Sequence, residues 1–307
     1  MKVLIVASYN ANRFSAFVIE QAESLKLLGV KFEYFGIKGK GIFGYLKNRK
    51  KLIVKIKDFQ PDIIHAHYGL SGALAVLQRK IPVVVTFHNG ETLSVLSNII
   101  SSFASLFAKY RIYVAQHIYD LCFFTMRENY TILPCGVNTN LDILDKNTTR
   151  EELGLNMEKK YILFGGAFSN LRKNYQLLEK AVCSLNRNDI EIIEMRDLTR
   201  EKITKLMFAC DLFALPTKSE GSPQALKEAM ACNCPILATD VADIKYLLGD
   251  LEGHYICSFD LTDVVIKIQF ALEFSERTNG RERIIKLGLD SETVANKVLQ
   301  VYKTIIK

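Results

Sequence analysis

The strongest constraint on the fold of this chain is the alternation of short apolar runs with longer segments of helical periodicity. In the first half, the runs that are typical of strands are Val3–Ala7, Lys31–Phe35, Ile63–His65, Val83–Phe87, Ile112–Val114 and Tyr130–Leu133. A helix is predicted from about Ser15 to Leu28, because its apolar residues recur every three or four positions. Strands that alternate with helices predict a parallel sheet with crossover connections, and therefore a doubly wound α/β domain.

The alternation stops near Asn138 and begins again after a polar, turn-rich stretch, NTNLDILDKNTTREELGLN. Further strands are expected at Tyr161–Phe164, Ile190–Glu194, Leu212–Leu215 and Pro235–Ala238, with helices at Thr149–Leu153, Tyr175–Leu185, Arg200–Ala209 and Pro223–Ala231. We therefore predict two doubly wound domains facing a cleft, the first at 1–143 and the second at 144–290. The remaining segment, 291–307, has the periodicity of one more helix. Ligands of such sheets bind at the carboxyl ends of the strands.

The composition is that of a folded protein with two domains of ordinary size. Of the 307 residues, 49% are apolar and 24% are charged, as in globular proteins. No apolar run reaches the roughly 20 residues that span a bilayer. The opening MKVLIVASYN fits a first strand better than a signal peptide, because its apolar stretch is only about six residues long. The seven cysteines are scattered, which favours a reduced, cytoplasmic protein.

The charge is concentrated in the first half of the chain. Residues 1–150 hold 19 Lys and Arg against 10 Asp and Glu. Much of the excess lies in the segment Lys38–Lys57, KGKGIFGYLKNRKKLIVKIK, which contains eight cations, no acid and several interleaved apolar residues. The segment is compatible with a solvated helix face beside a core face, with a patch that binds a membrane surface, or with nucleic-acid binding. The third alternative lacks a recognisable nucleic-acid module.

Two stretches of the second domain indicate a binding site. In SEGSPQALKEAM, Ser222 is expected as the N-cap of a helix and Pro223 as its first residue. Glu220 and Glu228 flank this helix start, and a carboxylate is a good acceptor for a vicinal diol such as that of ribose. After the strand Tyr161–Phe164, the sequence GGAFSNLRKNY supplies two glycines and then Arg172 and Lys173. Glycines followed by cations just before a helix favour phosphate binding.

At these residues the chain resembles family 4 of the retaining glycosyltransferases. The hallmark of that family is two glutamates separated by seven residues, and Glu220 and Glu228 stand at the two positions. Four further segments are similar to segments of the family and follow its order. They are PDIIHAHYGLSG (Pro61–Gly72), VVVTFHNGE (Val83–Glu91), ILPCGVNTN (Ile132–Asn140) and ILFGGAFSNLRKNYQLLEKAV. The resemblance implies the GT-B fold, with two Rossmann-like domains and a C-terminal helix, 291–307, that crosses back to complete the first.

The resemblance also implies roles for individual residues. In the donor domain, it implies that Glu228 binds the ribose hydroxyls of a nucleotide sugar. Glu220 would contact the sugar together with the backbone of Gly221, Ser222 and Gln224. Lys173 with Arg172 would bind the diphosphate, and Gly166 would allow close approach of the backbone. In the acceptor domain, His88 would lie near the reacting sugar, whereas His65 and His67 are expected to be structural. Together with His88, Glu220 and Lys173 are the expected catalytic residues.

The expected function is transfer of a sugar, with retention of configuration, from a nucleotide-diphosphate sugar to a glycan or lipid-linked acceptor. UDP is the commonest base in the family. No cofactor or metal is expected, because the family uses cations and a helix dipole in place of a metal and the chain lacks an Asp-x-Asp motif. Cell-surface polysaccharide synthesis at the inner face of the plasma membrane is the expected setting. The alternatives are a nucleotide-sugar epimerase or hydrolase on the same fold, an inactive nucleotide-sugar-binding protein, and a membrane adaptor.

Overall fold

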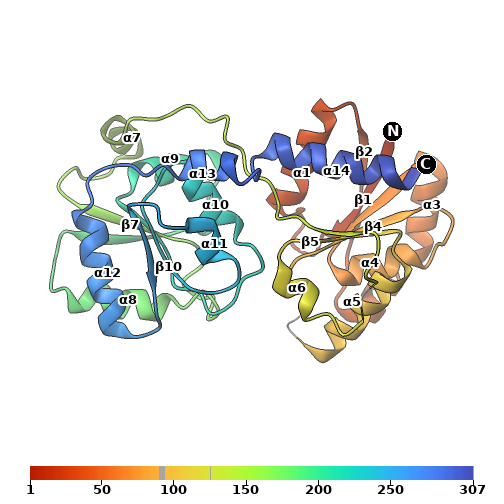
Figure 1. Cartoon of the computed structure of the whole chain (residues 1–307), viewed down its shortest axis with the longest axis horizontal. Helices are drawn as coiled ribbons and strands as arrows, with labels where there is room; N and C mark the ends of the chain where they lie inside the picture. Colours follow the sequence, from red (N-terminus) through yellow and green to blue (C-terminus); the bar gives the residue numbers. More distant parts are fainter. Residues whose placement is uncertain (90–93, 125, 307) are drawn as a thin grey trace. The chain divides into compact units, whose positions relative to one another are not determined.

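The computed structural model describes residues 1–89, 94–124 and 126–306, so Gly90 and Glu91 of the segment Val83–Glu91 lie outside it. The chain forms two compact units (Figure 1). Unit 1 comprises Met1–Gly136 and Ser291–Lys307, and unit 2 comprises Val137–Asp290. The chain therefore passes from unit 1 to unit 2 seven residues before the predicted boundary at 143/144. It returns to unit 1 at 290/291, where the second boundary was predicted.

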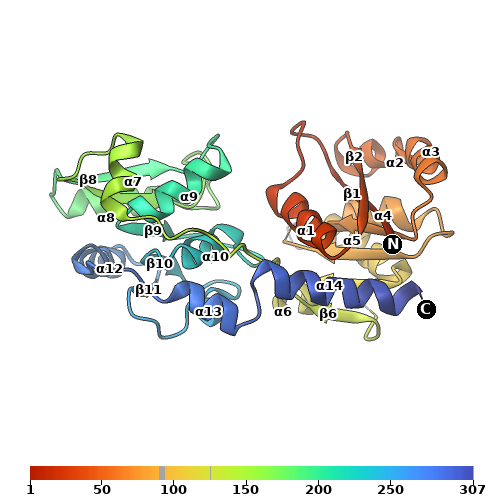
Figure 2. The same cartoon turned by 90° about the horizontal axis from the view of Figure 1, so that it is seen from above.

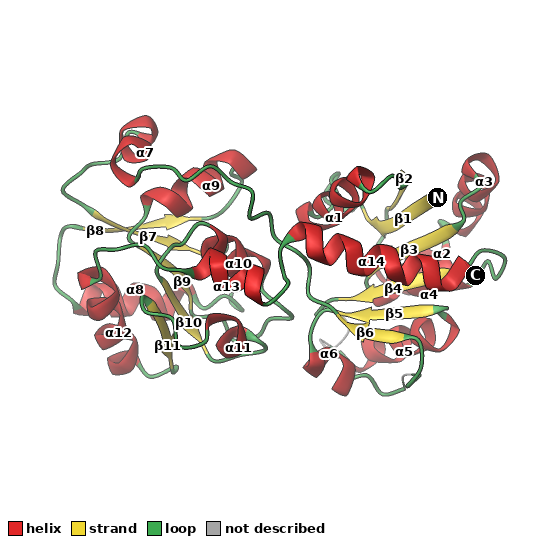
Figure 3. Ribbon diagram, turned by 45° about the horizontal axis from the view of Figure 1, so that its top comes forward, coloured by secondary structure: helices red, strands yellow, loops and turns green. Residues whose placement is uncertain are grey.

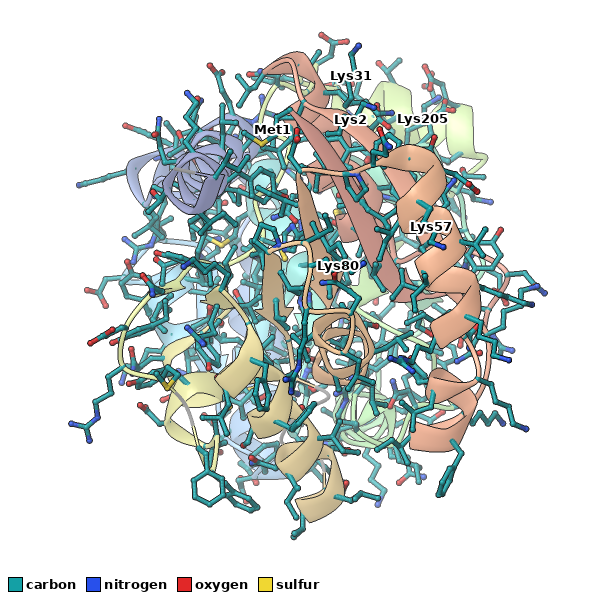
Figure 4. The ribbon with its side chains drawn as sticks, turned by 90° about the vertical axis from the view of Figure 1, so that its right-hand side faces the viewer. Met1, Lys2, Lys31, Lys57, Lys80 and Lys205 are labelled. Atoms are coloured by element: carbon teal, nitrogen blue, oxygen red, sulfur yellow. The ribbon has the colours of Figure 1, made fainter. Side chains whose placement is uncertain are left out.

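Unit 1 contains a six-stranded sheet in which every pair of neighbouring strands is parallel. Its order is β2-β1-β3-β4-β5-β6. The strands are β1 (Lys2–Ser8), β2 (Lys31–Ile37), β3 (Ile63–His67), β4 (Val83–Phe87), β5 (Tyr110–Tyr113) and β6 (Tyr130–Ile132). All six predicted strands are confirmed, and β3 extends two residues beyond its predicted end. The amino-terminal edge of this sheet carries Lys2, Lys31 and Lys80 (Figure 4).

Helices cover both faces of this sheet (Figures 1 and 2). They are α1 (Ala16–Leu27), α2 (Gly41–Leu46), α3 (Arg49–Phe59), α4 (Gly69–Val76), α5 (Val95–Phe107), α6 (Gln116–Asp120) and α14 (Ser291–Ile306). α1 and α14 pack on one face, where Val298 and Tyr302 of α14 are buried against Val3 and Ile5 of β1. α2 to α6 pack on the other face. The last helix therefore completes the core of unit 1.

Unit 2 contains a five-stranded parallel sheet of order β11-β10-β9-β7-β8 (Figure 3). The strands are β7 (Lys160–Phe164), β8 (Ile190–Glu194), β9 (Leu212–Leu215), β10 (Ile236–Thr239) and β11 (His254–Cys257). The helices are α7 (Lys146–Leu153), α8 (Tyr175–Ser184), α9 (Arg200–Ala209), α10 (Gln224–Ala231), α11 (Ile244–Leu248), α12 (Leu261–Glu273) and α13 (Gly280–Lys286). The predicted fold class, two doubly wound α/β domains, is confirmed; β11 is an edge strand that the sequence analysis did not predict.

A buried carboxylate fastens the first helix of unit 2 to its sheet. Asp211, at the start of β9, accepts hydrogen bonds from Arg150 Nη2 at 2.6 Å, from Lys146 Nζ at 2.8 Å and from the backbone N–H of Tyr161 at 2.7 Å. Asp211 and Arg150 are each 4% exposed. Despite the burial of the carboxyl group, these partners lower the pKa of Asp211. The network joins α7, β7 and β9, and so positions the strands that lead into the site described below.

We expect Asp211→Ala to destabilise unit 2 by about 3–5 kcal/mol, because the substitution leaves the Arg150 guanidinium buried without its partner. The free energy of unfolding in urea, followed by circular dichroism, measures the effect. The matched control is Asp189→Ala, which breaks an ion pair with Arg187 whose side chains are 40% and 37% exposed. A solvent-exposed pair of this kind contributes about 1 kcal/mol or less. Equal effects of the two substitutions would contradict the structural role of Asp211.

Candidate functional site

The carboxyl edge of the unit 2 sheet holds the predicted donor residues. β7 ends at Phe164, and Gly165 and Gly166 turn the chain out of the sheet. A side chain at Gly165 would put its Cβ 2.6 Å from the ring of Phe213, and one at Gly166 would put it 2.9 Å from Cγ of Lys173. Both glycines are thus required by the packing of the protein itself. Their predicted role, close backbone approach to a ligand, stays a prediction.

The loop that follows is fixed to the ends of both neighbouring strands. The backbone N–H of Phe168 donates to Glu194 Oε1, at the end of β8, at 2.7 Å. The carbonyl of Arg172 accepts from the backbone N–H of Lys218 at 2.9 Å and from Thr217 Oγ1 at 3.2 Å, both after β9. These contacts hold the backbone of Arg172 and Lys173 beside the loop after β9.

The structure brings together two of the predicted site residues from different loops. Lys173 Nζ donates to Glu220 Oε1 at 2.6 Å, and the two side chains are only 14% and 9% exposed. A charge-assisted hydrogen bond in such a sheltered position is stronger than one between surface side chains. The ammonium group is therefore held at one place on the edge of the sheet, where an anion could reach it only in competition with Glu220.

Glu228, on the first turns of α10, has a partner that the sequence analysis missed. Arg200 donates from Nη1 to Glu228 Oε2 at 3.0 Å and from Nη2 to Oε1 at 2.6 Å, which is the bidentate geometry of a guanidinium on a carboxylate. Arg200 was predicted as the first residue of a helix that follows a strand, and that position places it at the carboxyl edge. The sequence offered no signal for its pairing with a residue 28 positions away.

The start of α10 differs from the prediction. Pro223, expected as the first helical residue, is the N-cap with extended backbone (φ −68°, ψ 112°), and α10 begins at Gln224. Ser222, expected as the N-cap, therefore lies one residue too early to cap the helix, and Pro223 caps it with no side-chain hydrogen bond. Among the described residues, Ser222 Oγ is buried without a hydrogen-bond partner. Together with the buried Gly221, it forms the short turn between Glu220 and α10.

His88, the predicted catalytic residue of the first domain, lies in unit 1, just after β4. Its side chain is largely buried, at 8% exposure, between the rings of Phe17 and Tyr68, whose centroids are each 4.6 Å away. Its Nε2 lies 3.3 Å from Nδ1 of His67, and the two rings are stacked. Tyr68 adopts a positive φ of 70°, which is a strained conformation for an aromatic residue.

His67 and His65 continue this row into the interior of unit 1. The His65 ring is hydrogen-bonded to the hydroxyls of Tyr302, on α14, at 2.6 Å and of Thr86 at 2.7 Å. Burial lowers the pKa of His67 to about 3, and burial with the nearby His67 and His88 holds the pKa of His65 well below its usual value. Both rings are therefore neutral at physiological pH. In the described part of the chain, no group of three His, Cys, Asp or Glu side chains has an arrangement that could hold a metal ion.

Sequence comparison relates both units to glycosyltransferases. Residues 17–141 match the family described as Glycosyltransferase Family 4, and residues 156–273 match the family described as Glycosyl transferases group 1. A protein of Bacillus subtilis provisionally named as the teichuronic acid biosynthesis glycosyltransferase TuaC is 25% identical over 225 residues, 64% of this chain and 57% of that protein. An N,N'-diacetylbacillosaminyl-diphospho-undecaprenol alpha-1,3-N-acetylgalactosaminyltransferase of Campylobacter jejuni is 29% identical over 112 residues, 35% of this chain and 30% of that protein.

Solved structures show the same fold. Sucrose-phosphate synthase from Thermosynechococcus elongatus superposes with a TM-score of 0.83 at 16% identity, over 99% of both chains. HepE of Anabaena in complex with UDP superposes with a TM-score of 0.74 at 16% identity, over 99% of this chain and all of that one. The GT-B fold implied by the sequence is thus confirmed, and each half of the chain contains a segment that matches a glycosyltransferase family.

The two neutral histidines predict that unit 1 loses stability in mild acid. An unfolded histidine takes up a proton near pH 6.5, whereas folded His67 stays neutral down to about pH 3. The unfolded state therefore binds more protons in this window, and the free energy of unfolding falls as the pH falls through it. For His67 the loss between pH 7 and pH 5 is about 2 kcal/mol, measurable by urea unfolding at the two pH values.

His67→Asn should remove the part of the stability loss between pH 7 and pH 5 that His67 causes. This expectation holds whether or not the substitution changes the free energy of unfolding at pH 7. His117→Asn, which removes a partly exposed imidazole on α6, is measured beside it as the matched variant. The same loss between pH 7 and pH 5 in His67→Asn and in the parent protein would show that His67 is not held neutral by the fold.

Proposed function

We propose that this chain, built from two domains of the glycosyltransferase type, transfers a sugar from a nucleotide-diphosphate sugar to a glycan or lipid-linked acceptor, with retention of configuration. The chain covers only 57% of the TuaC sequence, so the activity is inferred from the site. One observation carries the proposal. The carboxyl edge of the unit 2 sheet brings two cations, Lys173 and Arg200, against the two hallmark glutamates, Glu220 and Glu228.

We assign the donor to unit 2. Lys173 suits the diphosphate, since it is sheltered and held beside the loop after β9, and Arg172 adjoins it. Glu228 suits the ribose diol, because a carboxylate oriented from one side by Arg200 presents a fixed acceptor. We assign Glu220 to the sugar, together with the backbone of Gly221, Ser222 and Gln224 that follows it. A UDP-sugar is the favoured donor, supported by HepE, which shares the fold and was solved with UDP.

The reaction breaks the bond from the anomeric carbon to the diphosphate and forms a bond from that carbon to the acceptor oxygen. The proton of the acceptor hydroxyl passes to the departing diphosphate on the same face of the sugar. Negative charge grows on the leaving phosphate, so preorganised positive charge at Lys173, Arg172 and the start of α10 lowers the barrier. In this proposal these groups act in place of a metal ion.

We assign the acceptor to unit 1, with His88 beside the reacting sugar. The row of His67 and His65 behind His88 and the rings of Phe17 and Tyr68 around it fix the orientation of its imidazole. A lipid-linked acceptor is supported by the relative named for a diphospho-undecaprenol substrate, and polysaccharide synthesis by the relative named for teichuronic acid. Such an acceptor places the protein on the cytoplasmic face of a membrane, where Lys38–Lys57 is the predicted contact.

The alternatives make distinct predictions. An epimerase or hydrolase would consume the nucleotide sugar when no acceptor is present. An inactive binding protein would bind the nucleotide sugar and never turn it over. A screen of UDP-, GDP- and ADP-sugars by thermal shift identifies the donor, because a ligand that binds the folded state raises the melting temperature. Product analysis with and without glycan or lipid-linked acceptors then separates transfer from both alternatives.

The assignment of Glu228 and Lys173 predicts two different losses of affinity. Glu228→Ala should abolish the preference for a nucleoside diphosphate over its 2′,3′-dideoxy analogue, a preference of about ten- to a hundredfold if two hydroxyls bond to a carboxylate. Lys173→Ala should weaken both nucleotides equally, because it acts on the diphosphate. Isothermal titration with the diphosphate of the base found in the screen measures both effects.

Lys245→Ala is the control for charge, since Lys245 is exposed on α11 of the same unit, and it should leave both affinities unchanged. In turnover assays, Glu228→Ala and Lys173→Ala should each lower kcat/KM by about a hundredfold or more. Full activity in both variants would refute the assigned roles.

Arg200 is expected to act by positioning Glu228. Arg200→Ala should raise KM for the donor about tenfold and leave kcat nearly unchanged, because a carboxylate that loses its bidentate partner loses its fixed orientation. Arg200→Lys should restore less than half of the effect, since an ammonium cannot reproduce the two parallel hydrogen bonds. A large fall in kcat with unchanged KM would assign Arg200 to the chemical step.

A further inference from the structure

Helix α5 of unit 1 is built with its polar side inward. Asn98, Ser101, Ser102 and Ser105 are buried, at 6% exposure or less. Large apolar side chains occupy the outer side of the same helix, at 38–66% exposure: Val95, Leu96, Ile99, Phe103, Leu106 and Phe107. A helix on the surface of a globular protein normally shows the reverse arrangement.

Close packing and hydrogen bonds fix this orientation. α5 packs against α4 through small residues, and a Cβ added at Gly69 of α4 would lie 1.9 Å from Ser101 Oγ. Asn98 donates to the carbonyl of Leu121 at 2.6 Å and accepts from the backbone N–H of Phe123 at 2.9 Å. Ser105 is hydrogen-bonded to the hydroxyl of Tyr113 at 3.0 Å. The outward apolar side is therefore a property of the folded unit.

The apolar surface continues on both sides of α5. Toward α2, a cavity of about 360 Å³ opens between α2, α4 and α5, with an almost wholly apolar lining that includes Leu46, Leu77 and Phe103. On the other side, the segment held by Asn98 exposes Leu121, Phe123 and Phe124, at 52–64%. Phe43 of α2 is 78% exposed. Exposed apolar patches of this extent mark an interaction site.

Positive charge borders this surface on two sides. On the α2–α3 side, Lys47, Arg49, Lys50 and Lys51 are exposed and form no ion pair with any described residue. Beyond the end of α5, the Arg79 guanidinium lies 5.3 Å from the ring centroid of Phe107. Arg79, Phe107 and the neighbouring Lys80 and Lys109 line one pocket. Lys80 is seen at the amino-terminal edge of the sheet in Figure 4.

Two cations of the segment Lys38–Lys57 do not belong to this border. Lys55 is paired with Glu33, and Lys38 donates to Asn12 at 2.9 Å and lies over the ring of Tyr9. The sequence prediction of a membrane patch was thus too broad at these two positions, and it missed the apolar surface of α5 altogether.

We propose that the α5 surface, defined as the outer side of α5 with α2 and the segment Leu121–Phe124, docks into the surface of a bilayer that contains anionic lipids. An anionic membrane offers both chemistries that the surface presents: headgroups for the bordering cations, and an apolar interior for the side chains of α5. The cavity between α2, α4 and α5 would take up part of an acyl chain.

A second copy of the chain fits this surface less well than a membrane. Two copies paired through the α5 surface would bring their own bordering cations together, and like charges repel. The docking is peripheral, because the described part of the chain holds no helix that is long and apolar enough to cross a bilayer. α5, with 13 residues, is about 20 Å long and would lie in the plane of the interface.

The absence of tryptophan from the sequence allows a direct test. In Phe103→Trp, the single indole should shift its emission to the blue and be quenched by brominated acyl chains when vesicles of phosphatidylglycerol and phosphatidylcholine are added. Phe270→Trp is the control, because Phe270 is also exposed, at 53% against 38% for Phe103, and lies on α12 of unit 2. It should respond to neither. Equal responses of the two variants, or no response at Phe103→Trp, would overturn the proposal.

Vesicle flotation separates the apolar and the electrostatic contributions. Ile99→Ser with Phe103→Ser should lower binding at least about tenfold on vesicles that contain phosphatidylglycerol. Gln in place of Lys47, Arg49 and Lys50 should weaken the preference for phosphatidylglycerol and lower the sensitivity of binding to salt. Gln in place of Lys202, Lys245 and Lys267, three cations of unit 2, should have no effect, and a loss equal to that of the first charge variant would refute a localised surface.

Two further measurements distinguish this proposal from dimerisation through the same surface and from the proposed transferase function. Analytical ultracentrifugation without vesicles tests for dimers. If the parent protein forms dimers and Ile99→Ser/Phe103→Ser does not, the surface binds a second copy, and the lipid proposal is overturned. The proposal does not depend on the transferase reaction, because every residue of the surface lies in unit 1. The α5 variants should therefore bind nucleoside diphosphate like the parent protein, even if the proposed donor chemistry is wrong.

Discussion

Parallel pairing of the strands is the constraint on which the rest of this structure depends. In a parallel sheet every strand delivers the segment that follows it to the same edge. In unit 2 this rule brings the loop after β7, Glu194 at the end of β8 and the turn after β9 to one place, although up to 55 residues separate Gly166 from Gly221. Hydrogen bonds from Phe168 and to the carbonyl of Arg172 then fix the loops to one another.

Charge compensation follows from that convergence. Glu220 and Glu228 are each about nine-tenths buried, and a carboxylate in such a position is costly without a cation beside it. Lys173, in the loop after β7, and Arg200, at the start of α9, supply one cation each. Because each cation is held by a carboxylate, an incoming anion has to compete with Glu220 for Lys173. A ligand that also offers hydroxyl groups to the carboxylates is therefore favoured over a simple anion.

The sequence was informative wherever a single periodicity determined the outcome, and uninformative wherever partners far apart in the chain did. All six strands of unit 1 followed from their apolar runs, because both faces of a parallel sheet are buried. The start of α10 was placed one residue early, since the capping rules favour Ser222 as the N-cap and Pro223 as the first helical residue, whereas the helix begins at Gln224. The pairing of Arg200 with Glu228 has no local signal. α5 was not among the predicted helices, and only the contacts of Asn98, Ser101 and Ser105 show which of its sides is inside.

The position of α14 has a consequence for the order in which the chain folds during synthesis. Val298 and Tyr302 cover Val3 and Ile5, and the Tyr302 hydroxyl holds the His65 ring. A ribosome that has made all of unit 2 has still not made this helix. Until it emerges, the face of β1 that α14 shares with α1 is only partly covered, whereas unit 2 can close its core without waiting. The amino-terminal half is thus the first to be translated and the last to be completed, and nascent chains should depend on chaperones chiefly through that half.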